Sequence, residues 1–250
     1  MRTALALALA LTSLAAPTAR ADEPLEQPLT SQSTDSAEKK RREFELGVQL
    51  YGGPNGSFLD EPSEEKKRVP KDVGPSVPYP GFAGVGGGGG LSVVGMWRGI
   101  VGLDLGFHVS LDQGHGKING FRFDLSQTAV HIPILLRVAA PYDKVRPFLF
   151  VGPEIVVPTN PKVEVERNAL TLEGDADTYV AVAFGFGFDI RLPTDKIDIR
   201  VPLMLRGSYT PSVSGYVADR VTVTGNQFTA LSTTWQYQAM VTLGVAIYFL

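Results

Sequence analysis

The sequence contains no cysteine, which excludes disulfide bonds, thiol catalysis, thiolate metal sites and a lipid-modified N-terminal cysteine. Beyond its first residues it also lacks any apolar run of the roughly 20 residues that a membrane-spanning helix needs. Basic residues are not in excess, because 23 lysines and arginines accompany 26 acidic residues and the net charge is −3. Nucleic-acid binding requires a basic face, so we expect no nucleic-acid partner.

The N-terminus has the three parts of a secretory signal peptide. Arg2 supplies a positive charge, an apolar run follows, and Ala19-Arg20-Ala21 is a small-x-small cleavage site. We therefore predict a signal peptide at residues 1–21. Residues 22–43 are polar and charged, which predicts a flexible periplasmic leader that cannot bury a core. The remaining domain covers residues 44–250.

The segment from Thr234 to Leu250 alternates apolar and other side chains almost without error. Successive side chains of a β-strand point to opposite faces, so this pattern predicts a strand with one apolar face. Its length suits a tilted membrane-spanning strand, with aromatic residues near both ends of the apolar face. That face consists of Trp235, Tyr237, Ala239, Val241, Leu243, Val245, Ile247 and Phe249.

Eight segments in all have strand character. They cover residues 44–51, 82–96, 100–111, 121–139, 146–157, 177–192, 197–210 and 234–250. An exported chain without a spanning helix can cross lipid as a closed barrel, because closure pairs every backbone group. The predicted fold class is therefore all-β, an eight-stranded antiparallel up-and-down transmembrane β-barrel. Its even number of strands leaves both ends of the barrel domain on the periplasmic side.

The predicted connections alternate between short and long. The short ones lie at 97–99, 141–144 and 193–196, and the long ones at 52–81, 112–120, 158–176 and 211–233. Short periplasmic turns and long outer loops are typical of bacterial outer-membrane barrels, which predicts that location. The expected partners are outer-membrane lipid, the barrel-assembly machinery during biogenesis, and an extracellular ligand or surface that meets loops 52–81 and 211–233. Within the last loop, Val221–Gly225 predicts a short hairpin.

Two hairpin registers follow from the short turns, with Ala140 paired with Val145 and Leu192 with Ile197. These registers place unlike charges opposite each other, namely His131 with Glu154, Asp189 with Arg200, and Arg191 with Asp198. Such pairs stabilise a sheet, whereas a one-residue slip would turn the charges toward lipid.

Two irregularities are expected within the strands. The apolar parity of residues 121–139 changes midway, which predicts a bulge between Ser126 and Ala129. The run Gly86–Gly90 lacks the Lys-Ser/Thr of a phosphate-binding loop, so it predicts a strand region of close packing or curvature.

Two stretches carry a resemblance to a known family. His131-Ile-Pro-Ile-Leu-Leu-Arg137 and Arg146-Pro-Phe-Leu-Phe-Val-Gly-Pro-Glu154 resemble signatures of the bacterial outer membrane β-barrel domain family. In these signatures Phe148 replaces a usual tyrosine and Phe150 a usual glycine. The resemblance implies an eight-stranded barrel of OmpA/OmpX or PorT type over residues 44–250, and it implies no activity. At the C-terminus, Phe249 is penultimate where many such barrels end on an aromatic residue.

Parity assigns a set of charged side chains to the inside of the barrel. An eight-stranded barrel is only wide enough for side chains to fill, and arginine binds carboxylates bidentately, so we expect a filled lumen. The predicted lumen charge network is Asp104, His131, Glu154, Asp189, Arg191, Asp198, Arg200 and Arg206. His108, Arg137 and Arg146 share this parity. A narrow passage for small solutes or amphiphiles is the alternative.

No cofactor, metal or catalytic residue is predicted. His108, His115 and His131 lack metal-ligand spacing. Ser110, Asp112 and His115 lie close together in sequence, but a catalytic triad is recognised by geometry rather than sequence proximity. We therefore expect a non-enzymatic role in envelope structure or in surface interaction through the long loops. A lipid-active enzyme and a soluble periplasmic barrel with an apolar interior are the remaining alternatives.

Overall fold

The computed structural model describes most of the barrel domain. Its described residues are 43–59, 76–78, 81–118, 121–140, 142, 144–165, 170–173, 177–194, 197–211, 220–224, 227–229 and 234–249. The chain divides into two units, Met1–Lys39 and Lys40–Leu250, and all described residues belong to the second. The predicted signal peptide and all but Glu43 of the predicted leader lie outside the described residues.

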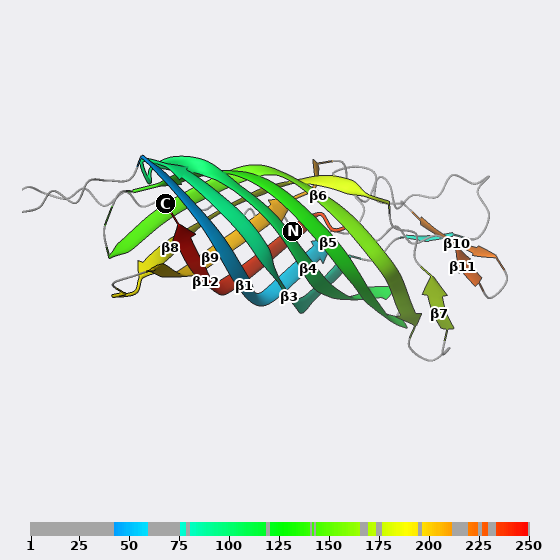
Figure 1. Ribbon diagram of the computed structural model, residues 1–250. Coiled ribbons are helices and arrows are strands. Elements are labelled where there is room, and N and C mark those ends of the chain that lie inside the picture. Colours follow the sequence, from blue (N-terminus) through cyan, green and yellow to red (C-terminus); the bar gives the residue numbers. More distant parts are fainter. Residues whose placement is uncertain are drawn as a thin grey trace, which may run out of the picture. The chain divides into compact units, whose positions relative to one another are not determined.

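Eight long strands form a closed antiparallel barrel (Figure 1). They are β1 (Phe44–Leu59), β3 (Phe82–Trp97), β4 (Val101–Ile118), β5 (Phe121–Ala139), β6 (Val145–Val165), β8 (Tyr179–Arg191), β9 (Asp198–Tyr209) and β12 (Tyr237–Phe249). Each pairs with its neighbours in chain order, and pairing of β1 with β12 closes the ring. The predicted fold class is confirmed. No helix in the described part of the chain has the length and apolar character to span a membrane.

The two ends of the barrel differ. One, which we call the turn end, carries the β3–β4, β5–β6 and β8–β9 connections together with Phe44 and Phe249. At the β3–β4 turn, Arg98 and Gly99 have φ values of 52° and 66°. Two successive positive φ angles are typical of a type I′ hairpin turn, which matches the twist of the flanking strands. The opposite end, the loop end, carries the short β4–β5 connection and the longer β1–β3, β6–β8 and β9–β12 connections.

Four short strands lie in these longer connections. β7 (Leu170–Glu173) pairs with β6. A separate three-stranded sheet contains β2 (Ser76–Pro78), β10 (Arg220–Thr224) and β11 (Gln227–Thr229). β10 pairs with β11, which confirms the predicted hairpin, and with β2, which joins the connection after β1 to the connection after β9.

Three strands are longer than predicted. β1 continues to Leu59, β4 to Ile118 and β6 to Val165. The prediction of a long loop at 112–120 was wrong, because Ile118 pairs with Phe121. The missed signal was the intervening Asn-Gly pair, which favours a two-residue hairpin connection. β1 runs through Gly52-Gly53-Pro54 because these residues pair with the glycine run of β3.

Both predicted hairpin registers were wrong by two residues. Ala139 pairs with Phe148, and Asp189 lies opposite Pro202 rather than Arg200. The turns therefore contain more residues than the sequence indicated. Side chains alternate with a period of two, so this shift leaves every residue on its predicted face, and parity could not detect it. The predicted bulge is confirmed by the register shift between Ser126 and Thr128.

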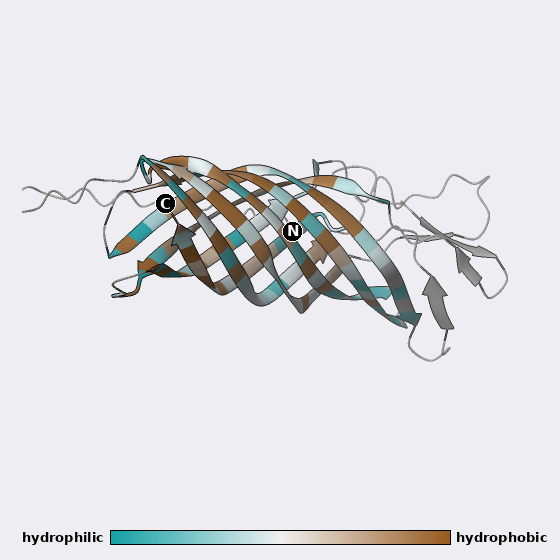
Figure 2. Cartoon of the chain, viewed as in Figure 1, coloured by the Kyte–Doolittle hydropathy of each residue, from teal (hydrophilic) through white to brown (hydrophobic). Residues whose placement is uncertain are grey.

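The outside of the barrel is an apolar belt. Figure 2 shows hydrophobic residues recurring along the barrel strands, and their side chains are exposed, as for Leu149 at 65% and Leu243 at 60%. Aromatic side chains are exposed at both ends, including Trp97 and Phe249 at the turn end and Phe58 and Tyr237 at the loop end. An exposed apolar band of this kind matches a lipid-facing surface between aromatic girdles.

One aromatic residue departs from the predicted pattern. Trp235 was assigned to the apolar outer face, but its side chain is only 1% exposed. It precedes β12, where strand alternation does not apply, and its ring lies against Gly114 of β4. Trp235 therefore packs at the loop end instead of extending the lipid-facing stripe.

Candidate functional site in the barrel lumen

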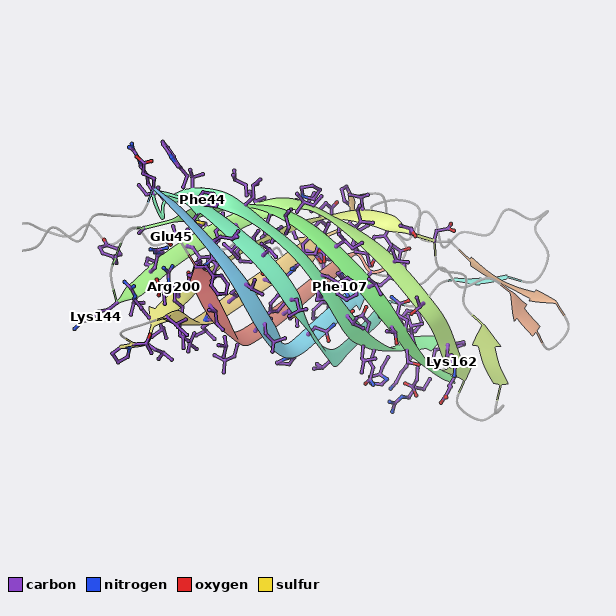
Figure 3. The ribbon with its side chains drawn as sticks, viewed as in Figure 1. Phe44, Glu45, Phe107, Lys144, Lys162 and Arg200 are labelled. Atoms are coloured by element: carbon purple, nitrogen blue, oxygen red, sulfur yellow. The ribbon has the colours of Figure 1, made fainter. Side chains whose placement is uncertain are left out.

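The turn end of the lumen is filled by an ion-pair cluster from four strands. Glu45 of β1 accepts hydrogen bonds from Arg146 of β6 at 2.9 Å and from Arg200 of β9 at 3.1 Å. Arg200 also binds Asp198 at 2.7 Å, and Arg191 pairs with Asp198 at 3.1 Å. Figure 3 shows Glu45 and Arg200 at this end and Lys162 at the other. The cluster ties together strands that are distant in sequence.

A second layer lies deeper in the lumen. Arg137 of β5 donates a hydrogen bond of 2.6 Å to Asp189 of β8 and lies 3.9 Å from a carboxylate oxygen of Asp104 of β4. Its guanidinium carbon lies 3.5 Å from the centre of the Phe148 ring, an arrangement suited to a cation–π contact. Arginine's planar, weakly hydrated charge suits a buried pair of this kind.

The third layer centres on the Glu154 carboxylate of β6. Its Oε1 lies 2.7 Å from Nδ1 of His131 and 2.6 Å from a guanidinium nitrogen of Arg206. The His131 ring stacks on the His108 ring, with centroids 4.2 Å apart and planes 8° from parallel. The second nitrogen of His131, Nε2, is 2.8 Å from the hydroxyl of Ser110. These side chains are almost completely buried.

Nearer the loop end, two side-chain amides donate hydrogen bonds to the buried carboxylate of Asp112. Asp112 accepts hydrogen bonds from Asn55 at 2.6 Å and from Gln238 at 3.1 Å. Gln238 also donates to Ser57 at 3.2 Å. Asp112 is only 1% exposed, although the sequence placed it in a loop. The extension of β4 to Ile118 turns this residue into the lumen.

The structure places the predicted network residues at several depths. Seven are buried or half-buried in the lumen, whereas Arg191 lies at the turn-end rim with 40% of its side chain exposed. His131 contacts Glu154 although the two are not direct cross-strand partners. The lumen network predicted from the sequence did not include Glu45, Ser110, Asp112 or Asn55. Parity along residues 44–50 would have placed Glu45 inside.

Ser110, Asp112 and His115, which are close in sequence, do not form a catalytic triad in the structure. His115 lies in the exposed β4–β5 hairpin extension, where its Nδ1 is 2.5 Å from Asp124. Ser110 instead contacts His131, on the neighbouring strand β5. These residues have separate partners because Ser110 and Asp112 point into the lumen, whereas His115 has the opposite parity in β4 and is exposed.

His108, His131 and Glu154 are also the one group in the described residues with donor atoms close enough to consider a metal, all within 4.8 Å. Three observations weigh against this use. The two rings are parallel, so their nitrogen lone pairs do not converge on one point. Both His131 nitrogens already have polar partners, and Arg206 places a positive charge on the carboxylate that would bind the cation.

A small cavity of about 20 Å³ adjoins this layer, enough for about one water molecule. Its lining residues come from six strands and are Asn55, His108, Ser110, His131, Glu154, Arg206, Ser208, Gln238, Ala239 and Met240. The cavity therefore gives Ser110 and His131 a common open space within the lumen.

An apolar exterior, a closed eight-stranded ring and an ionic interior define a transmembrane β-barrel. Solved structures similar to the chain include the Neisserial surface protein NspA (9% identity, TM-score 0.40, covering 83% of this chain and 98% of that one). They also include OprG from Pseudomonas aeruginosa (13%, 0.44, 81% and 95%) and Ail from Yersinia pestis (11%, 0.36, 83% and 100%). No protein-family model and no curated protein matches the sequence.

Proposed function

We propose that this protein is a non-conducting outer-membrane barrel that acts in envelope structure or in surface interaction through its loop end. The observation that carries the proposal is the bond from Arg137 to Asp189, which crosses part of the lumen between two strands that are not neighbours. With the Glu45 cluster below it and the Glu154 layer above it, ionic side chains occupy three successive depths. An ion would have to break these pairs to pass.

The loop end supplies the surface for interaction. In the β4–β5 extension, Arg122 and His115 both contact Asp124, and these side chains are exposed. The sheet of β2, β10 and β11 connects the two loops that the sequence marks for an extracellular partner. Polar segments held on a rigid barrel are typical sites of binding. By the usual orientation of these barrels, the turn end faces the periplasm.

Planar-bilayer recording tests the closed lumen. The purified full chain, with insertion verified by protease protection, should give no sustained single-channel steps. The variant with both Arg137→Ala and Asp189→Ala removes the cross-lumen pair and should give more frequent openings. Regular steps from the unaltered protein would overturn the proposal and favour the narrow-channel alternative.

Cell-based comparison separates envelope structure from surface interaction. A deletion strain is complemented either with the full chain or with a variant in which residues 115–124 are replaced by Asn-Gly. This change shortens the β4–β5 extension and leaves the rest of the barrel intact. If the extension serves surface interaction, adhesion falls while detergent resistance is restored. A deletion that changes neither adhesion nor detergent resistance would contradict both roles.

A further inference from the structure

Ser110, His131 and Glu154 form a linear chain of polar contacts across three adjacent strands. The Ser110 hydroxyl is 2.8 Å from His131 Nε2, and Glu154 Oε1 is 2.7 Å from Nδ1 of the same ring. A nucleophile, a base and an acid that orients the base form this arrangement in serine hydrolases. The residues are adjacent in no sequence motif, because β4, β5 and β6 bring them together.

One tautomer satisfies both contacts at once. A proton on Nδ1 is donated to Glu154, which leaves the Nε2 lone pair to accept the hydroxyl proton of Ser110. The ion pair with Arg206 stabilises Glu154 as a carboxylate. The carboxylate can therefore orient the ring and stabilise its protonated form, while His131 remains available as a base.

The surroundings also suit a charged imidazole. The parallel His108 ring, 4.2 Å away, offers a π face to the positive charge that His131 would acquire. Arg206 lines the same small cavity, and its guanidinium carries several N–H groups. Such donors are the type that stabilises negative charge developing on a substrate oxygen.

We propose that Ser110 is a catalytic nucleophile toward small carboxylic esters with an acetyl-sized acyl group, with His131 as base and Glu154 as a positioning residue. The size limit follows from the cavity, which holds about one water molecule, so that lining side chains, among them the flexible Met240, have to move to make room for an acyl group. This activity is additional to the closed-barrel role and does not depend on it.

Hydrolysis of the ester would proceed through an acyl-serine and needs water as its only co-reactant. Ser110 Oγ forms a bond to the acyl carbon while its proton passes to Nε2 of His131. The carbon–oxygen bond to the leaving alcohol then breaks, and the alkoxide takes that proton. Water next attacks the acyl-serine, gives its proton to His131, and releases the carboxylic acid as Ser110 regains the proton.

Methanesulfonyl fluoride, a very small serine reagent, tests the nucleophile. The full-length protein in detergent is treated, digested and examined by mass spectrometry for sulfonylated serine. The reaction forms a sulfur–oxygen bond, breaks the sulfur–fluorine bond and releases fluoride and a proton. We expect modification at Ser110. Ser208 lines the same cavity without a histidine among its hydrogen-bond partners in the described chain, so it is an internal control.

Four variants distinguish the roles of the three residues. Ser110→Ala should remove the adduct, and His131→Gln should slow labelling by at least about 100-fold, the usual contribution of a general base. Glu154→Gln should also slow labelling, with partial recovery in Glu154→Asp. Heat-modifiable gel migration verifies that each variant forms a barrel. An unmodified Ser110 in the folded protein, labelling equal to that of Ser208, or labelling unaffected by His131→Gln would overturn the proposal.

Discussion

Arg137 binds Asp189 across the lumen at 2.6 Å, although the two residues lie 52 positions apart and their strands, β5 and β8, are separated by β6. Asp104 lies on the other side of the same guanidinium, at 3.9 Å. Arg137 thus neutralises two buried carboxylates. In the described residues, Nε of Arg137 and Oδ1 of Asp189 have no hydrogen-bond partner, so the pair is not fully satisfied.

Replacing Arg137 with Met should therefore destabilise the barrel strongly. Removal of one partner of a buried ion pair costs about 3–5 kcal/mol, because an uncompensated charge remains. The double variant Arg137→Met with Asp189→Leu should recover part of this loss, because Asp104 still lacks the guanidinium that it faces. Urea unfolding in lipid vesicles, followed by gel migration, measures both. A single variant as stable as the unaltered protein would contradict the assigned pairing.

The glycine run of β3 provides a matched pair of substitutions. A methyl group added at Gly90 would overlap the Phe107 carbonyl oxygen and Cβ of His108, whereas at Gly87 its nearest neighbour is the Gly53 oxygen at 3.6 Å. Gly90→Ala should lower the folded fraction at a given urea concentration, and Gly87→Ala should have little effect. Equal stability of the two variants would show that the run does not pack as described.

The outer face should tolerate charge only near its ends. Phe107, in the middle of the membrane-spanning part of β4, and Val145, the first residue of β6 at the turn end, are both exposed to the exterior. An arginine at the bilayer midplane costs about 2–4 kcal/mol and near the interface about 0–1 kcal/mol. Folding free energies measured in vesicles should thus fall more for Phe107→Arg than for Val145→Arg. The reverse order would contradict the membrane placement.

The β4–β5 extension should respond to acid. Burial opposes the shift, but hydrogen bonds from Arg122 and His115 hold the pKa of Asp124 below its ordinary value of 3.8. A lowered pKa stabilises the folded state above the unfolded value, and this contribution is lost as pH falls through the folded one. The protection of amides near the tip against hydrogen exchange, relative to their intrinsic exchange rates at the same pH, should therefore decrease as the pH falls below about 4. In Asp124→Asn the acid-dependent change should disappear, and its persistence would contradict this assignment.

The fold was predictable because one physical rule repeats along the whole chain. Apolar side chains at every second position of Thr234–Leu250 specify a strand with a lipid-facing side, and the same rule located all eight strands. Strand ends were less predictable. Gly52-Gly53-Pro54 is typical of a break, and only the facing glycines of β3 make it a paired strand.

The site was predictable only as a set of inward residues. Parity places Asp189 and His131 inside, but depth along the lumen depends on register, strand tilt and turn length, and a two-residue shift is invisible to parity. The partnership of Ser110 with His131 also depends on that register. Asp112 was missed because the predicted strand ended one residue before it.

The alternation of lipid-facing and lumen-facing side chains in β8 tests the barrel assignment most directly. Because the chain has no native cysteine, only an introduced cysteine would be labelled. Single cysteines at the exposed positions Phe184, Phe186 and Phe188, and at the buried positions Tyr179, Ala181 and Ala183, would be labelled with a fluorophore in vesicles that contain a lipid-chain quencher. Strong quenching at the three phenylalanine positions and weak quenching at the other three is the predicted result. Equal quenching at all six positions, or the opposite alternation, would contradict an apolar exterior around an ionic lumen.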